Sequence, residues 1–367
     1  MLTSLRIQNF RSIRDASVKL GQVNLFIGPN NSGKSNFLKG IELFSSSISS
    51  PNHKAYTDSE FNRILTKQGD NKAKYSEQIF IHGQTWIKTD KIVYLISKEF
   101  CKNDADTKSE IGAFNMVTEP KIIKSHPAHL SDTIPFAPYT LRNFFLNTII
   151  YKIDPSRFLL STKVSPDESL SESGANIVSF IHNLSQNYEP LFQQLKINLN
   201  ACISDLVRVA TPADPDTRGN IKLKFFDKSG RDYWAEEVSE GVLYFLALLC
   251  IVHQPDPPKL LLLEEPEKGI HPRRIKEVMD FIFELAELRS IQIIITSHSP
   301  YVVDHFADIP ECISVFDREN GETVIRNAGD IINETNAELI EKGHKPISYT
   351  DSLGEYWVSG CLGGVPV

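Results

Sequence analysis

The sequence predicts an α/β fold built around buried parallel strands. Apolar runs occur at Val23–Ile27, Leu260–Leu263 and Ile291–Thr296, which is the pattern of strands covered on both faces. Segments with apolar residues at helical spacing separate such strands, including one from Arg274 to Leu288. Strands and helices that alternate in this way are typical of parallel sheets with helical layers.

The composition is that of a soluble globular protein. Of 367 residues, 41% are hydrophobic and 23% are charged, enough for two domains or for one large domain with an insertion. Arg6 and Arg11 interrupt the first residues, so no signal peptide is expected, and no apolar run approaches the ~20 residues of a membrane span. Five scattered cysteines without a CxxC pair argue against a zinc site and favour a reducing compartment. We expect a cytoplasmic protein with no membrane partner.

The charge of the chain gives no strong drive toward nucleic acid. Its formal net charge is −7, from 39 Lys and Arg against 46 Asp and Glu. Proteins that hold nucleic acid mainly through its phosphates usually present a basic surface. A local basic patch is still compatible with this composition, so nucleic acid is a possible partner but not a required one.

The sequence patterns divide the chain into a discontinuous head, an insertion and a tail. Residues 1–45 and 215–330 carry the strand and helix patterns of the head. Residues 46–214 are expected to form an inserted lid and a helical lobe, with antiparallel strands where apolar residues alternate after residue 76. Residues 331–367 are expected to form a tail that packs on the head or on a partner.

A phosphate loop follows the first buried strand. Residues Gly28 to Ser35 match the pattern GxxxxGK(S/T) without a mismatch, between a strand and an amphipathic helix. In such a loop, backbone N–H groups and the helix N-terminus surround the phosphates, Lys34 neutralises the β- and γ-phosphates, and the Ser35 hydroxyl ligates Mg²⁺. The predicted ATP-binding residues here are Asn30, Asn31, Ser32, Gly33, Lys34, Ser35 and Asn36.

Two carboxylates end the next apolar strand. Glu264 and Glu265 directly follow Leu260–Leu263, and a buried strand rarely ends in charge unless the charge faces a site at the edge of the sheet. We assign Glu264 to the Mg²⁺ shell, directly or through water, and Glu265 to the general base that activates the attacking water. Without the phosphate loop, the same residues could form a solvated loop.

Two further motifs complete a composite site. Ser239 and Gly241 open an apolar helix; Ser239 would be a good N-cap, and its hydroxyl also suits a γ-phosphate supplied across a dimer interface. His298 follows the strand Ile291–Ile295, where an imidazole can sense the γ-phosphate and support the catalytic carboxylate. A purely structural histidine is the alternative.

The order of these motifs resembles the ABC-type ATPase heads of the SMC and RecF proteins. The opening residues Leu5 to Ser12 are similar to the first strand of those heads, whose arginine approaches the nucleotide; Arg11 is the matching residue. The resemblance implies an ABC-type P-loop ATPase head with a mixed sheet, and ATP and Mg²⁺ as cofactors. It also implies a homodimer joined through an ATP sandwich, in which Ser239 and Gly241 act on the nucleotide of the other copy.

Three stretches also resemble the OLD-related and PtuA-like ATPases of bacterial anti-phage operons. They are EEPEKGIHP from Glu264, SGANIVSFIHNL from Ser173 and SLGEYWVSGCLGGVP from Ser352. The signature is SEG where transporters have SGGQ, so Ser239 and Gly241 match but the glutamine does not; the Q-loop glutamine is not placed, and Gln78 and Gln84 are weak candidates. About 70 residues follow the TSHSP motif, too few for the nuclease domain of OLD proteins, so any nuclease would be a separate protein.

The sequence therefore predicts a slow, regulated ATPase that acts as a nucleotide-gated dimeric sensor or scaffold. The resemblance places it in an anti-phage defence complex with a separately encoded effector, a nuclease or a toxin. The alternative is a DNA-repair or chromosome-maintenance head that binds duplex DNA directly. The SEG signature disfavours a transporter subunit, and no carboxylate cluster outside the ATPase motifs supports a nuclease in its own right.

Overall fold

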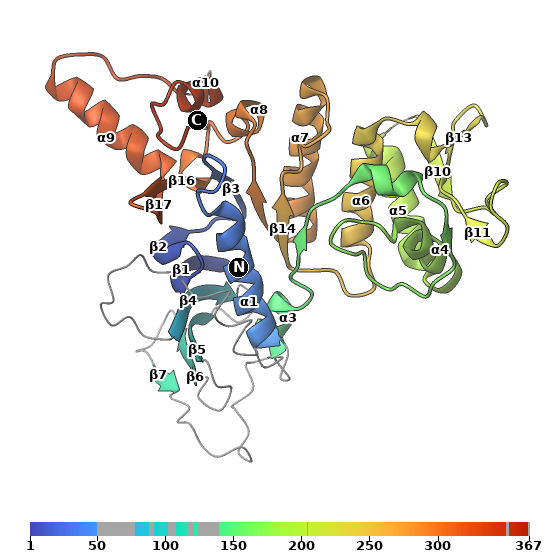
Figure 1. The fold of residues 1–367 in the computed structure, drawn as a ribbon, viewed down its shortest axis with the longest axis horizontal. Coiled ribbons are helices and arrows are strands. Elements are labelled where there is room, and N and C mark those ends of the chain that lie inside the picture. Colours follow the sequence, from blue (N-terminus) through green and yellow to red (C-terminus); the bar gives the residue numbers. More distant parts are fainter. Residues whose placement is uncertain are drawn as a thin grey trace. The chain divides into compact units, whose positions relative to one another are not determined.

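The protein is described by a computed structural model, which divides into two compact units. The first consists of Met1–Thr148 and Ile291–Val367, and the second of Ile149–Ser290 (Figure 1). The described residues are 1–49, 78–87, 92–101, 108–115, 121–123, 139–203, 205–349 and 352–365. The contacts group residues 149–214 with the acidic strand, whereas the sequence patterns assign them to the insertion. The division into head, insertion and tail that the sequence suggests stays a prediction, and the two units are a separate division based on contacts.

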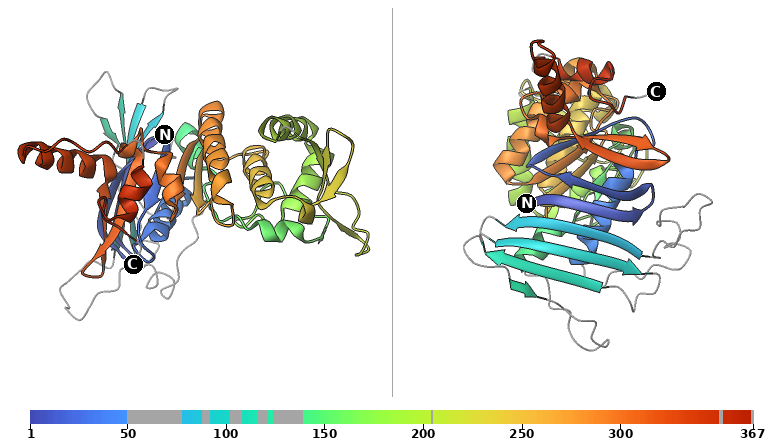
Figure 2. Two further views of the ribbon diagram at one scale, coloured as in Figure 1. Left: turned by 90° about the horizontal axis from the view of Figure 1, so that it is seen from above. Right: turned by 90° about the vertical axis from the view of Figure 1, so that its left-hand side faces the viewer.

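An antiparallel sheet in the first unit joins the start of the chain to the strands after residue 76. Its strand order is β2-β1-β4-β5-β6-β7, and all neighbours are antiparallel, as predicted for this part of the chain (Figure 2). The strands are β1 (Leu2–Phe10), β2 (Ile13–Lys19), β4 (Gln78–Ile87), β5 (Ile92–Cys101), β6 (Lys108–Asn115) and β7 (Lys121–Ile123).

A second sheet in the first unit forms around β3 (Val23–Ile27), whose five residues are all buried. β15 (Gln292–Thr296) and β16 (Ile313–Glu319) flank β3 as parallel neighbours, and β17 (Glu322–Asn327) pairs with β16 in the antiparallel direction. Because parallel strands end at the same edge, the segments that follow β3 and β15 emerge side by side. The mixed sheet confirms the predicted fold class.

Helix α1 (Lys34–Ser49) packs an apolar face on these strands. The ring of Phe37 meets those of Phe26 and Phe316 edge-on, each at 5.7 Å between centroids. A Cβ at Gly40 would lie 2.4 Å from Ile7 Cδ1, so the helix approaches β1 closely. The other α-helices among the described residues of this unit are α3 (Tyr139–Phe145), α8 (Pro300–Asp304), α9 (Ala328–Glu341) and α10 (Leu353–Val358).

The second unit contains the acidic strand and a helical lobe. β14 (Leu260–Glu264) pairs in parallel with β8 (Ile150–Tyr151), and every residue of α6 (Glu240–Val252) after the first is buried. The remaining helices are α4 (Ile177–Asn187), α5 (Glu189–Cys202) and α7 (Pro272–Arg289). The remaining strands are β9 (Thr162–Lys163), which pairs with β11 (Asn220–Ile221), and the antiparallel set β10 (Leu206–Ala210), β12 (Lys224–Asp227) and β13 (Asp232–Trp234). Within the described ranges, no helix has the length and apolarity needed to cross a bilayer.

Candidate nucleotide site

The phosphate loop has a backbone that requires its two framework glycines. Gly28 and Gly33 have φ of +143° and +109°, which other residues rarely adopt. A Cβ at Gly28 would lie 2.1 Å from the Phe316 carbonyl oxygen, and one at Gly33 would lie 2.2 Å from Thr323 Oγ1. Phe316 of β16 and Thr323 of β17 therefore support the loop and leave no room for a side chain at either position.

Lys34 is folded back across the loop that precedes it. Its side chain is nearly buried, at 6% exposure, and Nζ donates to the carbonyl oxygens of Gly28 at 2.7 Å and Pro29 at 2.9 Å. The first turn of α1 contains no acidic residue. The loop thus combines a lysine charge with the positive end of a helix, which is the arrangement that binds phosphate groups.

Arg11 lies in the turn between β1 and β2, next to the first turn of α1. Its Nη1 donates to Asn36 Oδ1 at 3.4 Å, and Asn36 in turn donates to Ser12 Oγ at 2.9 Å. Ser12 Oγ is 2.9 Å from Thr323 Oγ1, which links this turn to the β16–β17 hairpin. Arg11 Nε is buried and has no hydrogen-bond partner within the described part of the chain. A buried donor of this kind is costly unless it is paired, and a phosphate oxygen would satisfy it.

His298 lies two residues after the end of β15, the strand that pairs with β3. In the register of these strands Thr296 pairs with Phe26, and the Ser297 amide donates to the Phe26 carbonyl oxygen at 3.1 Å. His298 itself is half-buried. Within the first unit, the structure therefore brings the segment of His298 next to the start of the phosphate loop.

The acidic pair lies at the end of β14 in the second unit. Glu264 is the last residue of the strand, 16% exposed, and its Oε1 is 3.7 Å from Lys152 Nζ. Glu265 has φ of +50°, a left-handed conformation that is uncommon for a residue with a long side chain. Such local strain is concentrated at functional sites. The catalytic role of Glu265 stays a prediction.

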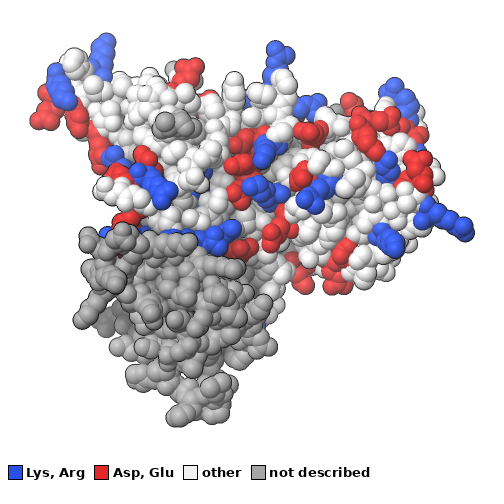
Figure 3. All heavy atoms as spheres, viewed as in Figure 1, with Lys and Arg blue, Asp and Glu red and all other residues white. Residues whose placement is uncertain are grey.

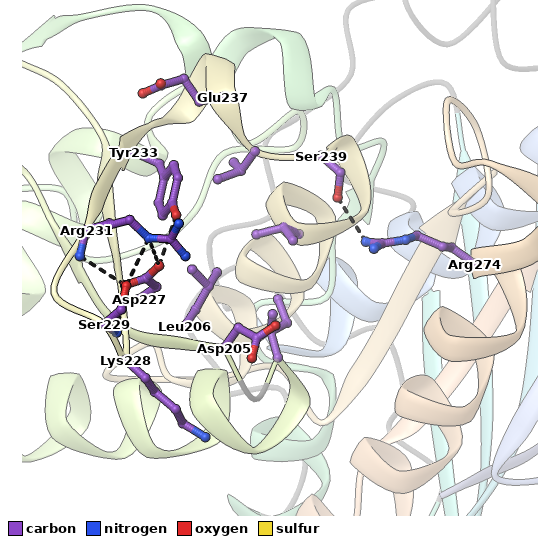
Figure 4. Close-up of a pocket in the computed structure, with 13 residues that line it drawn as sticks. Asp205, Leu206, Asp227, Lys228, Ser229, Arg231, Tyr233, Glu237, Ser239 and Arg274 are labelled. Carbon is purple, nitrogen blue, oxygen red and sulfur yellow. Dashed lines mark hydrogen bonds and ion pairs between the residues drawn. The ribbon is translucent and has the colours of Figure 1, made fainter.

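The signature turn, Ser239 to Gly241, contacts the segment that follows the acidic pair. Ser239 occupies the N-cap position of α6, but its side chain does not cap the helix; its Oγ accepts a hydrogen bond from Arg274 Nη1 at 3.0 Å (Figure 4). A Cβ at Gly241 would lie 3.6 Å from Arg274 Cδ, an ordinary van der Waals distance. A Cβ at Gly269 would lie 2.7 Å from Glu240 Oε2. The predicted trans site and the loop after β14 are thus in direct contact within the second unit.

Ser239 and Arg274 also line a cavity of about 580 Å³ (Figure 4). Asp227 lies in its wall, where hydrogen bonds from neighbouring side chains hold the pKa of this carboxyl below its usual value. The donors are Ser229, Tyr233 and Arg231. The wall on this side is therefore a hydrogen-bonded network of an ion pair and two hydroxyl groups.

The predicted site residues divide between the two units. The first unit contains Arg11, Asn30, Asn31, Ser32, Gly33, Lys34, Ser35, Asn36 and His298, and the second contains Ser239, Gly241, Glu264 and Glu265. Gln78 and Gln84 fall on β4, but their side chains lie outside the described residues. Among the described side chains, no three His, Cys, Asp or Glu residues are grouped as a metal cluster would require.

Sequence reasoning did not single out Thr323 or Arg274. Thr323 supports Gly33 across the hairpin, and Arg274 holds the Ser239 hydroxyl. Neither residue belongs to a motif, and both act through contacts between segments far apart in the chain. The sequence signal for such contacts is the glycine at positions 28 and 33, since a residue without a side chain allows another segment to approach closely.

A protein-family model identifies the chain once this geometry is known. The model, described as "AAA domain, putative AbiEii toxin, Type IV TA system", matches residues 23–304. The chain belongs to this family. The match begins with β3, includes the phosphate loop, the signature turn and the acidic pair, and ends with α8. This AAA-type ATPase family thus covers every predicted site residue except Arg11. Curated protein sequences give no match.

Solved SMC head domains share the fold of this AAA-type chain. The SMC head domain from Thermotoga maritima has a TM-score of 0.50 at 12% identity, covering 89% of this chain and 98% of that one. An SmcHead bound to the C-winged helix domain of ScpA has a TM-score of 0.57 at 14% identity, covering 90% and 99%. An Smc head domain with an extended coiled coil, bound to the C-terminal domain of ScpA derived from Pyrococcus furiosus, has a TM-score of 0.52 at 13% identity, covering 93% and 98%. These neighbours confirm the predicted SMC-like P-loop head as a fold.

Proposed function

We propose that the chain binds and hydrolyses Mg·ATP, and that two copies enclose the nucleotides between them. The observation that carries this proposal is the phosphate loop. Gly28 and Gly33 shape its backbone, Lys34 lies across it, and a helix without acids in its first turn begins within it. Membership in an AAA-type ATPase family supports the same conclusion.

Each side chain in the proposed site has one task. Lys34, Arg11 and the loop amides bind phosphate oxygens, while Ser35 and Glu264 hold the metal. Mg²⁺, when bound, neutralises charge that develops on the phosphates. Glu265 orients the attacking water and accepts its proton, and His298 supports this carboxylate near the γ-phosphate.

The second copy completes the site in the proposed dimer. Ser239 presents a hydroxyl and Gly241 an uncrowded backbone at the start of α6, whose positive end faces the γ-phosphate of the other copy. Ser239 does not cap its own helix, and its Oγ accepts a hydrogen bond from Arg274. A serine hydroxyl that accepts one hydrogen bond can still donate another, which is what a phosphate oxygen requires. Nucleotide would join the two heads, and hydrolysis would separate them.

We further propose a regulatory role, as the sensor or scaffold of an anti-phage defence complex whose effector is a separate nuclease or toxin. The family description and the stretches that resemble OLD-related and PtuA-like ATPases support this role. The alternative is a head that binds duplex DNA, which the similarity to SMC head folds favours. Over the described residues visible in Figure 3, however, Lys and Arg are interspersed with Asp and Glu.

A mixing experiment tests the shared site. Lys34→Ala removes the phosphate-binding half of a site, and Ser239→Ala removes the half supplied by the partner. Each variant alone is expected to lose turnover, but in a mixed dimer one site receives Lys34 from one chain and Ser239 from the other. Mixing the two inactive proteins should therefore restore ATPase activity. If no ratio of the two variants restores turnover while wild-type protein is active, the two-chain site is wrong.

A second comparison separates the two roles. Binding of duplex DNA by the ATP-bound protein, with an affinity that falls steeply as salt increases, would support the DNA-binding head. Co-purification of the products of neighbouring genes from the native host, without DNA binding, would support the defence scaffold.

A further inference from the structure

Residues 352–365 are packed into the first unit beside the phosphate loop. Three apolar side chains of this segment, Leu353, Trp357 and Leu362, are exposed by 0%, 0% and 2%. Burial this complete shows that these three side chains belong to the core of the unit and anchor the segment to it.

The first contact of the segment is with α8, which begins two residues after His298. The Gly354 amide donates to Asp304 Oδ1 at 2.8 Å. A Cβ at Gly354 would lie 2.3 Å from the Pro300 carbonyl oxygen, so the two backbones touch without room for a side chain. α10 therefore fixes the start of the helix that follows His298.

The second contact is with the backbone that supports the phosphate loop. The Gly364 amide donates to Asp317 Oδ2 at 3.3 Å. A Cβ at Gly364 would lie 2.9 Å from the Phe316 carbonyl oxygen, 2.7 Å from Val315 Cγ1 and 3.5 Å from Gly28 Cα. The same Phe316 oxygen limits the space at Gly28, so one carbonyl group lies between Gly364 and the first glycine of the phosphate loop.

Trp357 links the two contacts. Its buried indole N–H donates to the Gly364 carbonyl oxygen at 3.2 Å, which ties the turn after α10 to the helix itself. One connected piece of backbone thus contacts the helix after His298 at one end and the support of Gly28 at the other.

We infer that residues 352–365 are a positioning element of the nucleotide site, which holds the phosphate loop and the His298 segment in one fixed arrangement. This inference rests on the proposed function. A loop that binds phosphate through backbone N–H groups depends on the placement of those groups, and a shift of a few tenths of an ångström weakens several hydrogen bonds together. Displacing Gly364 moves the Phe316 carbonyl and hence Gly28.

Adjacent glycines provide a matched pair of variants. Gly364 and Gly363 have φ of +61° and +71°, so alanine at either position strains the backbone to a similar degree. A Cβ at Gly363 meets nothing within 4 Å, whereas one at Gly364 meets the support of the phosphate loop. The two variants, Gly364→Ala and Gly363→Ala, therefore differ in that contact and share the strain.

The measurements are the Kd for a fluorescent ATP analogue with Mg²⁺ and the melting temperature of each full-length protein. We expect Gly364→Ala to bind about tenfold more weakly than wild type and Gly363→Ala within about twofold, with similar losses of melting temperature. Trp357→Phe keeps a buried ring but removes the indole N–H that binds Gly364, so it should also raise the Kd. If Gly364→Ala does not fold, the Kd of Trp357→Phe tests the inference in its place, and an unchanged Kd would contradict it.

Hydrogen exchange distinguishes a positioning element from a purely structural segment, because ATP should not alter amide exchange in the latter. Mg·ATP should slow amide exchange in residues 353–365 of the wild-type protein but not of Lys34→Ala. Equal Kd values for Gly364→Ala and Gly363→Ala, or exchange in this segment that is indifferent to ATP, would overturn the inference. If wild-type protein binds no ATP, the proposed function fails instead.

Discussion

His253 provides a quantitative test of the packing behind the signature turn. It lies at the C-cap of α6, 1% exposed, where its Nδ1 donates to the Leu249 carbonyl oxygen at 2.7 Å. Its Nε2 accepts from Arg289 Nη2 at 2.7 Å and from Asn198 Nδ2 at 3.2 Å. With donors on both sides of Nε2, the imidazole fits this site in its neutral form.

Burial is the largest cause that lowers the pKa of His253 from 6.5 to about 4; the bond to Leu249 opposes this shift and the nearby Arg289 charge adds to it. Because the folded-state pKa lies below the unfolded value, the unfolded chain binds the proton first as pH falls. The contribution of neutral His253 to the free energy of unfolding is complete above pH 6.5 and is lost between pH 6.5 and 4. At 1.36 kcal/mol per pKa unit, the loss is about 3 kcal/mol overall and about 2 kcal/mol by pH 5.

Urea unfolding at pH 7.5, 6 and 5 measures this effect in wild type and in His253→Gln. The variant should be less stable at pH 7.5, and the difference between the two proteins should shrink by about 2 kcal/mol by pH 5. His344→Gln, at an exposed position, controls for the loss of a histidine. Parallel pH profiles for wild type and His253→Gln would refute the reasoning, since they would mean that His253 titrates alike in both states.

Three further predictions concern the nucleotide site. Lys34→Ala should abolish binding of a fluorescent ATP analogue, and retained binding would contradict the phosphate-loop assignment. Glu265→Gln should remove turnover and leave an ATP-bound dimer visible by light scattering; hydrolysis at the wild-type rate would show that another group is the base. Gly33→Ala should weaken ATP binding by at least about tenfold, because its Cβ would overlap Thr323, whereas Gly321→Ala, at a positive φ in open space, should bind normally.

Much of the architecture follows from local patterns in the sequence. The phosphate loop and its helix form a contiguous motif, so Lys34 could be placed at the start of α1 from the residues alone. The apolar runs Leu260–Leu263 and Ile293–Ile295 identify β14 and β15, because a strand buried on both faces is apolar over most of its length. The polar residues at their ends then indicate the site.

Other features depend on which distant segments come together. The sequence does not state that β3 lies between β15 and β16, because strand pairing is decided by the packing of the whole sheet. It allowed Ser239 to be either a helix cap or a contact for a γ-phosphate, and only the folded chain shows that this hydroxyl binds Arg274 and does not cap the helix. The contact of Gly364 with the carbonyl group that supports Gly28 joins residues more than 300 positions apart. Short motifs in the sequence therefore identify the residues of the site, whereas its rigidity arises from close backbone contacts that form only when the chain is folded.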